Sequence, residues 1–161
     1  MKITIAKNAG FCFGVKRATD FVESLIEKKD ENTEIYTLGN LIHNDTYIKS
    51  LESRGVYSID LDTALKKAES VDNKKIYFII RTHGIEKKSE EKLRALAERN
   101  PNLQIVDMTC PFVKRIHKIA ADNTKKDTLF ILLGNENHPE VKGILSYVTG
   151  DYLTFSSEEE L

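Results

Sequence analysis

Two cysteines, three histidines and one glutamate occupy comparable places along this sequence, each shortly after an apolar segment. These residues are Cys12, His43, His83, Cys110, His138 and Glu140. Thiolates are soft metal ligands, imidazoles bind metals or neutralise anions, and a carboxyl group can deliver a proton. Because five separate loops each carry such a residue, we predict one shared site with metal, anion and proton-transfer chemistry.

The two cysteines alone leave the identity of any metal open. Cys12 and Cys110 are far apart in the chain, and they could form one disulfide, be inert core thiols, bind a metal or act in catalysis. The sequence has no CxxC pair, and two thiolates are fewer than the four that usually hold a cubane iron–sulfur cluster.

Glycines flank the first cysteine in the segment AGFCFGV, at Gly10 and Gly14. Glycine is required where the backbone turns sharply or approaches a bulky group closely. A metal cluster would be such a group, although a glycine pair is a weak signal when taken alone. The pair indicates a close approach near Cys12 without identifying its partner.

The elements that must position these residues are short strands that alternate with helices, which is typical of an α/β protein with small, largely parallel sheets. Expected strands cover 2–6, 34–38, 56–59, 75–80, 104–107, 128–133 and 152–155. Expected helices cover 15–28, 45–54, a segment from Asp60 or Asp62 towards Ser70, 87–99, a segment from Pro111, and 139–148. His117 falls inside the helix from Pro111, so we interpret it as a structural residue.

Parallel sheets bind ligands beyond the carboxyl ends of their strands, where loops and helix N-termini meet. The candidate residues all follow expected strands, so we expect them to face a shared cleft. Unpaired N–H groups at helix N-termini also favour anions.

Composition excludes some function classes. Lysine plus arginine number 24 and aspartate plus glutamate 25, so the formal net charge of −1 provides no field that attracts nucleic acid or an anionic membrane. No apolar stretch approaches the roughly 18 residues of a membrane span, and we expect a cytoplasmic protein. Residues 156–160 resemble the start of a helix that the chain does not continue, which indicates truncation.

Five segments resemble one known family in their sequence and order: GFCFGVKRA at 10–18, IHND at 42–45, THG at 82–84, DMTCPFVKRIHK at 107–118 and NHPEVKG at 137–143. The family is that of the 4-hydroxy-3-methylbut-2-enyl diphosphate reductases, also called LytB or IspH proteins. The resemblance spans nearly the whole chain.

The resemblance implies three α/β modules around a central cavity. Residues 1–100 would form one complete module, whose first strand could belong to a module absent from this chain, and 101–161 an incomplete one. A [4Fe-4S] cluster would be held by three cysteines, of which Cys12 and Cys110 match the first two and the third has no counterpart here. His43, His83 and His138 would surround the substrate diphosphate, and Glu140 would deliver a proton.

The implied reaction is the reductive dehydroxylation of 4-hydroxy-3-methylbut-2-enyl diphosphate to isopentenyl and dimethylallyl diphosphate in the non-mevalonate isoprenoid pathway. Ferredoxin or flavodoxin would supply electrons, with no nucleic acid or membrane as partner, and we expect the 161-residue chain alone to be inactive. Two alternatives stay open: a non-enzymatic phosphate-binding or assembly module, and a zinc hydrolase in which His, Cys and Glu ligate zinc.

Overall fold

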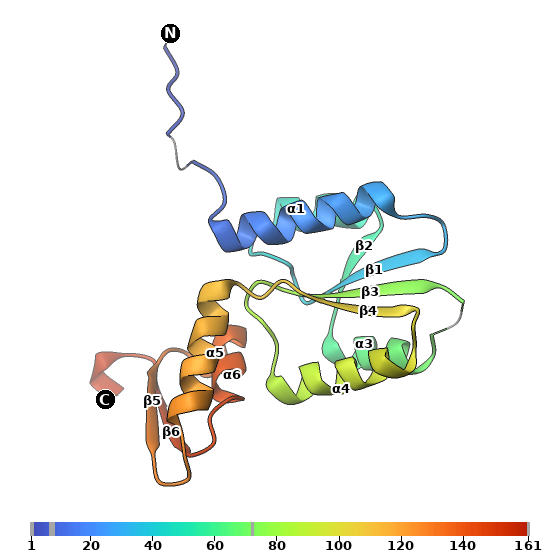
Figure 1. Cartoon of the computed structure of the whole chain (residues 1–161). Coiled ribbons are helices and arrows are strands. Elements are labelled where there is room, and N and C mark those ends of the chain that lie inside the picture. The colour runs from blue at the N-terminus through green and yellow to red at the C-terminus, as the bar shows by residue number, and fades with distance from the viewer. Residues whose placement is uncertain (1, 7–8, 72, 161) are drawn as a thin grey trace.

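The computed structural model of the chain describes residues 2–6, 9–71 and 73–160. Strands and helices alternate along the chain, and the paired strands are all parallel. They form two separate sheets, each with its own helices (Figure 1). The expected α/β fold class with small, largely parallel sheets is confirmed.

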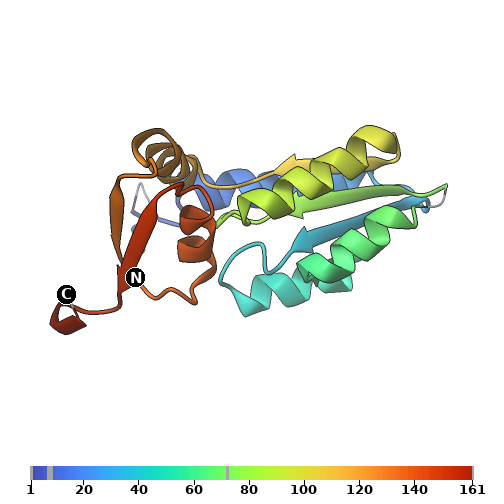
Figure 2. The same ribbon diagram turned by 90° about the horizontal axis from the view of Figure 1, so that it is seen from below.

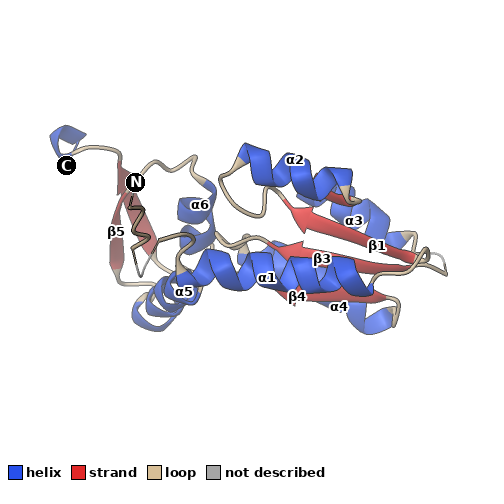
Figure 3. Ribbon diagram, turned by 90° about the horizontal axis from the view of Figure 1, so that it is seen from above, coloured by secondary structure: helices blue, strands red, loops and turns tan. Residues whose placement is uncertain are grey.

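The larger unit has four strands and four helices. Its strands are β1 (Thr33–Leu38), β2 (Val56–Ile59), β3 (Lys75–Ile80) and β4 (Leu103–Asp107). Its helices are α1 (Phe13–Lys28), α2 (Asp45–Ser53), α3 (Leu61–Glu69) and α4 (Lys87–Arg99). The strand order is β2-β1-β3-β4, with α1 and α2 over one face and α3 and α4 over the other (Figures 2 and 3).

Strand β3 lies in the middle of the core because its sequence KIYFII is apolar on both faces. Phe78 and Ile80 pack in the cluster that includes side chains of α3 and α4, whereas Ile79 packs in the cluster with α1 and α2. All three side chains are fully buried. Alternate residues of a strand point to opposite faces, so a continuous apolar run fits a strand between two helix layers.

Helix starts follow the sequence signals. The side chain of Asn44 caps α2 by accepting a hydrogen bond from the Tyr47 N–H at 3.0 Å, and Asp60 caps α3 by accepting one from the Thr63 N–H at 2.7 Å. The helix expected from Pro111 begins there, since proline suits the first helical position.

The smaller unit consists of α5 (Pro111–Asn123), β5 (Leu129–Leu133), α6 (Pro139–Leu145), β6 (Asp151–Phe155) and the 3-10 helix η1 (Glu158–Glu160). Strands β5 and β6 pair with each other, and α5 contacts α6. Leu129, Ile131 and Leu133 are each more than half exposed on β5. The described residues therefore leave apolar side chains of this sheet uncovered.

The expected first strand at 2–6 is wrong for the described structure. Residues 2–6 belong to no strand, and Ile3 and Ile5 are 74% and 81% exposed. Figure 1 shows this segment leading away from both sheets. A β-strand requires a neighbour for its backbone hydrogen bonds, and neither sheet offers one to this segment.

The boundary between the two sheets lies later in the chain than the expected module boundary at residue 100. Strand β4, which the sequence division assigned to the second module, pairs with β3 from Ile76↔Leu103 to Ile80↔Asp107. Helix α6 ends at Leu145, earlier than the expected residue 148. The change from one sheet to the other therefore comes after Asp107, at the segment leading into α5.

None of the helices in the described part of the chain combines the length and the apolar character needed to cross a bilayer.

Candidate functional site

Three histidines from three different loops lie together where the two units meet. His43 follows β1, His83 follows β3, and His138 precedes α6. The ring centroids of His43 and His83 are 4.6 Å apart, those of His83 and His138 6.0 Å, and those of His43 and His138 6.4 Å. We call these three residues the histidine cluster.

Thr82 joins the loops that carry two of these histidines to the start of α5. Its hydroxyl donates a hydrogen bond to the Leu41 carbonyl at 3.1 Å, and its own carbonyl accepts one from the Cys110 N–H at 2.8 Å. The Thr82 side chain is buried. One residue therefore holds the loop after β1, the loop after β3 and the Cys110 turn in fixed relation.

His138 caps α6 with its own side chain. Its Nδ1 accepts a hydrogen bond from the Glu140 N–H at 3.2 Å, so in the neutral ring the proton belongs on Nε2. Glu140 is half-buried in the first turn of α6. His138 and Glu140 both line a cavity of about 520 Å³ whose walls also include Ile116 and Asn135.

The environment of His83 favours an uncharged ring. Burial, together with electrostatic repulsion from His43, Arg81 and His138, lowers the pKa of His83 from 6.5 to about 4. Desolvation is the largest of these effects, and the repulsion adds to it. An anion placed against the histidine cluster would remove part of this penalty.

The two cysteines stand at the N-terminal ends of two helices that meet near Gly14. Cys12 precedes α1 and is exposed, and Cys110 precedes α5 and is half-buried. A Cβ atom on Gly14 would lie 2.6 Å from the Cys110 Sγ, so the glycine leaves room for this thiol. The Arg17 Nη2 donates a hydrogen bond to the Thr109 carbonyl at 2.7 Å, which joins α1 to the turn before Cys110.

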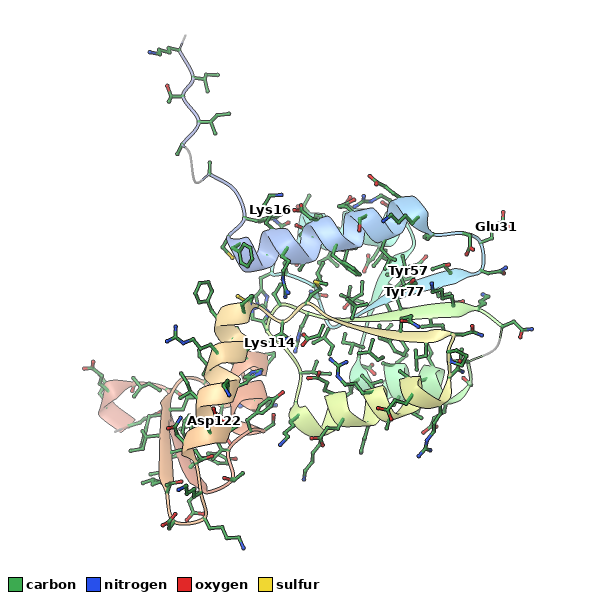
Figure 4. The ribbon with its side chains drawn as sticks, in the orientation of Figure 1. Lys16, Glu31, Tyr57, Tyr77, Lys114 and Asp122 are labelled. Atoms are coloured by element: carbon green, nitrogen blue, oxygen red, sulfur yellow. The ribbon has the colours of Figure 1, made fainter. Side chains whose placement is uncertain are left out.

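An ion pair also fixes the turn at Cys110. The Asp107 carboxylate pairs with the Lys114 Nζ and accepts a hydrogen bond from the Thr109 N–H at 2.8 Å. Figure 4 shows Lys114 on the N-terminal half of α5, with Asp122 towards the other end of the helix. Burial raises the pKa of Asp107, but the bonds from Lys114 and Thr109 outweigh it, so the net pKa is lowered and the carboxylate stays charged.

The donor set fits part of a metal site. Across residues 2–6, 9–71 and 73–160, no three His, Cys, Asp or Glu side chains are arranged to hold a metal ion. The thiols of Cys12 and Cys110 are soft metal ligands, and they stand at the starts of two neighbouring helices. The Cys110 thiol occupies the space beside Gly14.

Sequence reasoning missed the residues that connect the loops. Thr82 and Arg17 lie inside the THG and GFCFGVKRA segments, but their contacts with Leu41 and Thr109 join residues far apart in the chain. Arg81 and its effect on His83 were likewise unforeseen, since only the fold brings them near the other histidines.

Comparisons with known proteins find similar sequences over nearly the whole chain. The model of the family described as LytB protein matches residues 3–161. A 4-hydroxy-3-methylbut-2-enyl diphosphate reductase of Caldanaerobacter subterraneus subsp. tengcongensis is 41% identical over 161 residues, which cover 99% of this chain and 52% of that protein.

Two solved structures are also similar. A structure of (E)-4-hydroxy-3-methyl-but-2-enyl diphosphate reductase, described as the terminal enzyme of the non-mevalonate pathway, aligns with a TM-score of 0.73 and 34% identity, covering 98% of this chain and 52% of that one. The reductase structure from Plasmodium falciparum aligns with a TM-score of 0.70 and 29% identity, covering 91% and 42%. The chain spans about half the length of the curated relatives it matches. From its match to the family model over nearly all residues, the chain belongs to the LytB protein family.

Proposed function

We propose that this chain provides the diphosphate-binding and proton-delivering part of a reductase that removes the allylic hydroxyl of 4-hydroxy-3-methylbut-2-enyl diphosphate. The products would be isopentenyl and dimethylallyl diphosphate. The observation that carries the proposal is the convergence of His43, His83 and His138 from three loops. The names of the relatives supply the substrate.

The histidine cluster would bind the diphosphate. Imidazole rings donate hydrogen bonds to phosphate oxygens and can gain a proton when an anion is near. Mutual repulsion with His43, Arg81 and His138 is part of what lowers the pKa of His83, and a diphosphate would offset it. A local cluster of this kind can bind a diphosphate although the whole chain has a formal net charge of −1.

Cys12 and Cys110 would hold two corners of a [4Fe-4S] cluster. When bound, such a cluster supplies single electrons and an open metal position that accepts an oxygen ligand. The chain contains no third cysteine. This chain would fix the positions of the two thiols relative to each other. Arg17 would do so through its bond to the Thr109 carbonyl, and Gly14 would leave space for the Cys110 thiol.

Glu140 would deliver one of the two protons that the two-electron reductive dehydroxylation consumes as the hydroxyl leaves as water. Its carboxyl lines the same cavity as His138 and comes from the same helix turn, so substrate held by the histidine would lie within reach of the acid. Half-burial limits competition from water for this proton.

The proposal extends to organisation and partners. One complete and one incomplete α/β module would surround one cavity. The expected division at residue 100 would shift to just after Asp107, because strand β4 pairs in the first sheet. Ferredoxin or flavodoxin would donate electrons in the cytoplasm.

The test uses the family-length protein that carries these residues, reconstituted anaerobically with iron and sulfide and supplied with a one-electron reductant. Glu140→Gln keeps the side-chain shape but removes the transferable proton, so turnover should fall about a hundredfold to ten-thousandfold while substrate binding persists. His43→Ala should instead weaken substrate binding. Near-normal turnover of Glu140→Gln would refute the proton role, and diphosphate binding without any product would favour the phosphate-binding module.

A further inference from the structure

His117 is the histidine outside the cluster, and it is buried between the two units. The side chain is 6% exposed, and its Nε2 has no hydrogen-bond partner among the described residues. Its ring stacks on Tyr147, with the centroids 4.6 Å apart and the planes 19° from parallel. An unpartnered buried nitrogen destabilises a fold, so the packing around this ring must outweigh that cost.

Two glycines, Gly84 and Gly143, leave room for the His117 ring. Gly84 follows His83 directly, has a φ of +75° and would place a Cβ only 3.1 Å from the His117 Cε1. Gly143, on α6, would place a Cβ 3.4 Å from the His117 Nε2 and 3.8 Å from the His83 carbonyl oxygen. The imidazole therefore fits between the loop that carries His83 and the helix that carries Glu140.

We propose that His117 is a positioning residue that sets the distance between the His83 loop and α6. The ring acts as a flat spacer. Tyr147 supports one face of the ring, and the bare backbones at Gly84 and Gly143 contact its edge. If the spacer is removed, the loop and the helix can approach or separate, and His83 loses its fixed relation to His138 and Glu140.

The surroundings favour a neutral spacer. Burial is the largest effect on the pKa of His117 and lowers it; Asp107 raises it and Lys114 lowers it, with a lowered pKa as the net result. Asp107 and Lys114 pair with each other. A neutral ring can stack on Tyr147 without the desolvation cost of an imidazolium.

The pKa of His83 reports on this spacing, because burial and the nearby His43, Arg81 and His138 hold it at about 4. Titration of the His83 ring by NMR in the 161-residue chain measures it without substrate. In His117→Ala we expect the His83 pKa to rise by about one unit, since water enters and the neighbouring rings relax. In His117→Phe, which keeps a flat ring, we expect a change below about 0.3 unit.

The matched control is Val113→Ala, another buried residue one turn earlier on α5. It should destabilise the helix packing while leaving the His83 pKa unchanged. If His117→Ala does not fold, His117→Leu takes its place, because leucine fills volume but lacks the flat ring. An unchanged His83 pKa in the ring-less variant, or an equal change in Val113→Ala, would overturn the proposal. The role of His117 in catalysis rests on the proposed function. The His83 pKa needs no turnover, so this test can fail while the proposed function stands, and the reverse.

Discussion

Single residues in this chain are explained by what lies against them. The sequence indicated a close approach at Gly14 and left a metal cluster as one candidate for the bulky group. The structure identifies the neighbour as the thiol of Cys110, because a Cβ on Gly14 would lie 2.6 Å from its Sγ. The glycine therefore allows the starts of α1 and α5 to meet, which is a contact no local pattern contains.

Gly14→Ala should accordingly destabilise the chain by about 1–3 kcal/mol, the usual cost of overpacking. The measurement is the free energy of unfolding in urea. The double variant Gly14→Ala with Cys110→Ala tests the cause, since it removes the Sγ at 2.6 Å and leaves only the Cβ of residue 110 at 3.1 Å. In that background the added methyl should cost less than half as much, and an undiminished cost would show that the thiol is not the obstacle.

His83 should make stability depend on pH. Its pKa is about 4 in the folded chain, against the ordinary value of 6.5 that applies once the chain unfolds, so the unfolded chain binds more protons between these two values. The stabilisation is therefore complete above about pH 6.5 and is lost as the pH falls towards about 4. Discounted for the partial exposure of the ring, the loss is about 1–2 kcal/mol.

Urea unfolding of the wild type and of His83→Asn at about pH 7 and about pH 4.5 checks this prediction. The variant should lose less stability on acidification than the wild type, because asparagine does not titrate. Equal losses in the two proteins would show that His83 titrates near its ordinary pKa.

At the scale of elements, the sequence was informative wherever local chemistry decides the structure. The run KIYFII predicted β3 and Pro111 predicted the start of α5, and the structure agrees. The sequence left Asp60 and Asp62 as alternative caps of α3, and the structure has Asp60 in that place. The segment 2–6 has the same β-branched pattern but forms no strand, because pairing depends on a neighbour that a single segment cannot specify.

The candidate site was predictable as a set of loops but not as a geometry. Parallel topology places the ends of β1 and β3 on one edge, so His43 and His83 could be expected together. His138 belongs to the unit of the second sheet. Its position relative to His43 and His83 depends on the direction that the chain takes from β4 into α5. Thr82 makes the tertiary bonds that fix these loops, and its role could not be read from its position in THG.

Thr82→Val should remove the side-chain hydrogen bond of this residue and leave its backbone bond with Cys110 in place. Valine keeps the shape but loses the hydroxyl bond to the Leu41 carbonyl, which should cost about 0.5–1.5 kcal/mol, because the carbonyl keeps only the longer bond from the Thr82 N–H at 3.4 Å. The loop that carries His43 should loosen relative to His83. Thr82→Ser, which keeps the hydroxyl, is the matched control for urea unfolding and for the NMR signals of the two rings. A Thr82→Ser variant as destabilised as Thr82→Val would mean that the methyl contact, not the hydrogen bond, matters.

At the scale of the whole molecule, two α/β units lie next to each other (Figure 1), and the histidine cluster draws on loops from both of them. The larger unit contributes Cys12, His43 and His83, and the smaller unit, which begins after β4, contributes His138 and Glu140. Cys110 lies at the junction and is bonded to the larger unit through Thr82. The proposed chemistry therefore depends on the arrangement of the units and not on either sheet alone.

The most direct test of the central claim is an NMR titration of the four histidine rings with inorganic pyrophosphate, at constant ionic strength maintained with sodium chloride. We predict that the signals of His43, His83 and His138 shift together with one dissociation constant, that the pKa of His83 rises, and that the buried His117 ring does not move. Unchanged cluster signals, or shifts confined to His117, would contradict the claim that the histidine cluster binds a diphosphate.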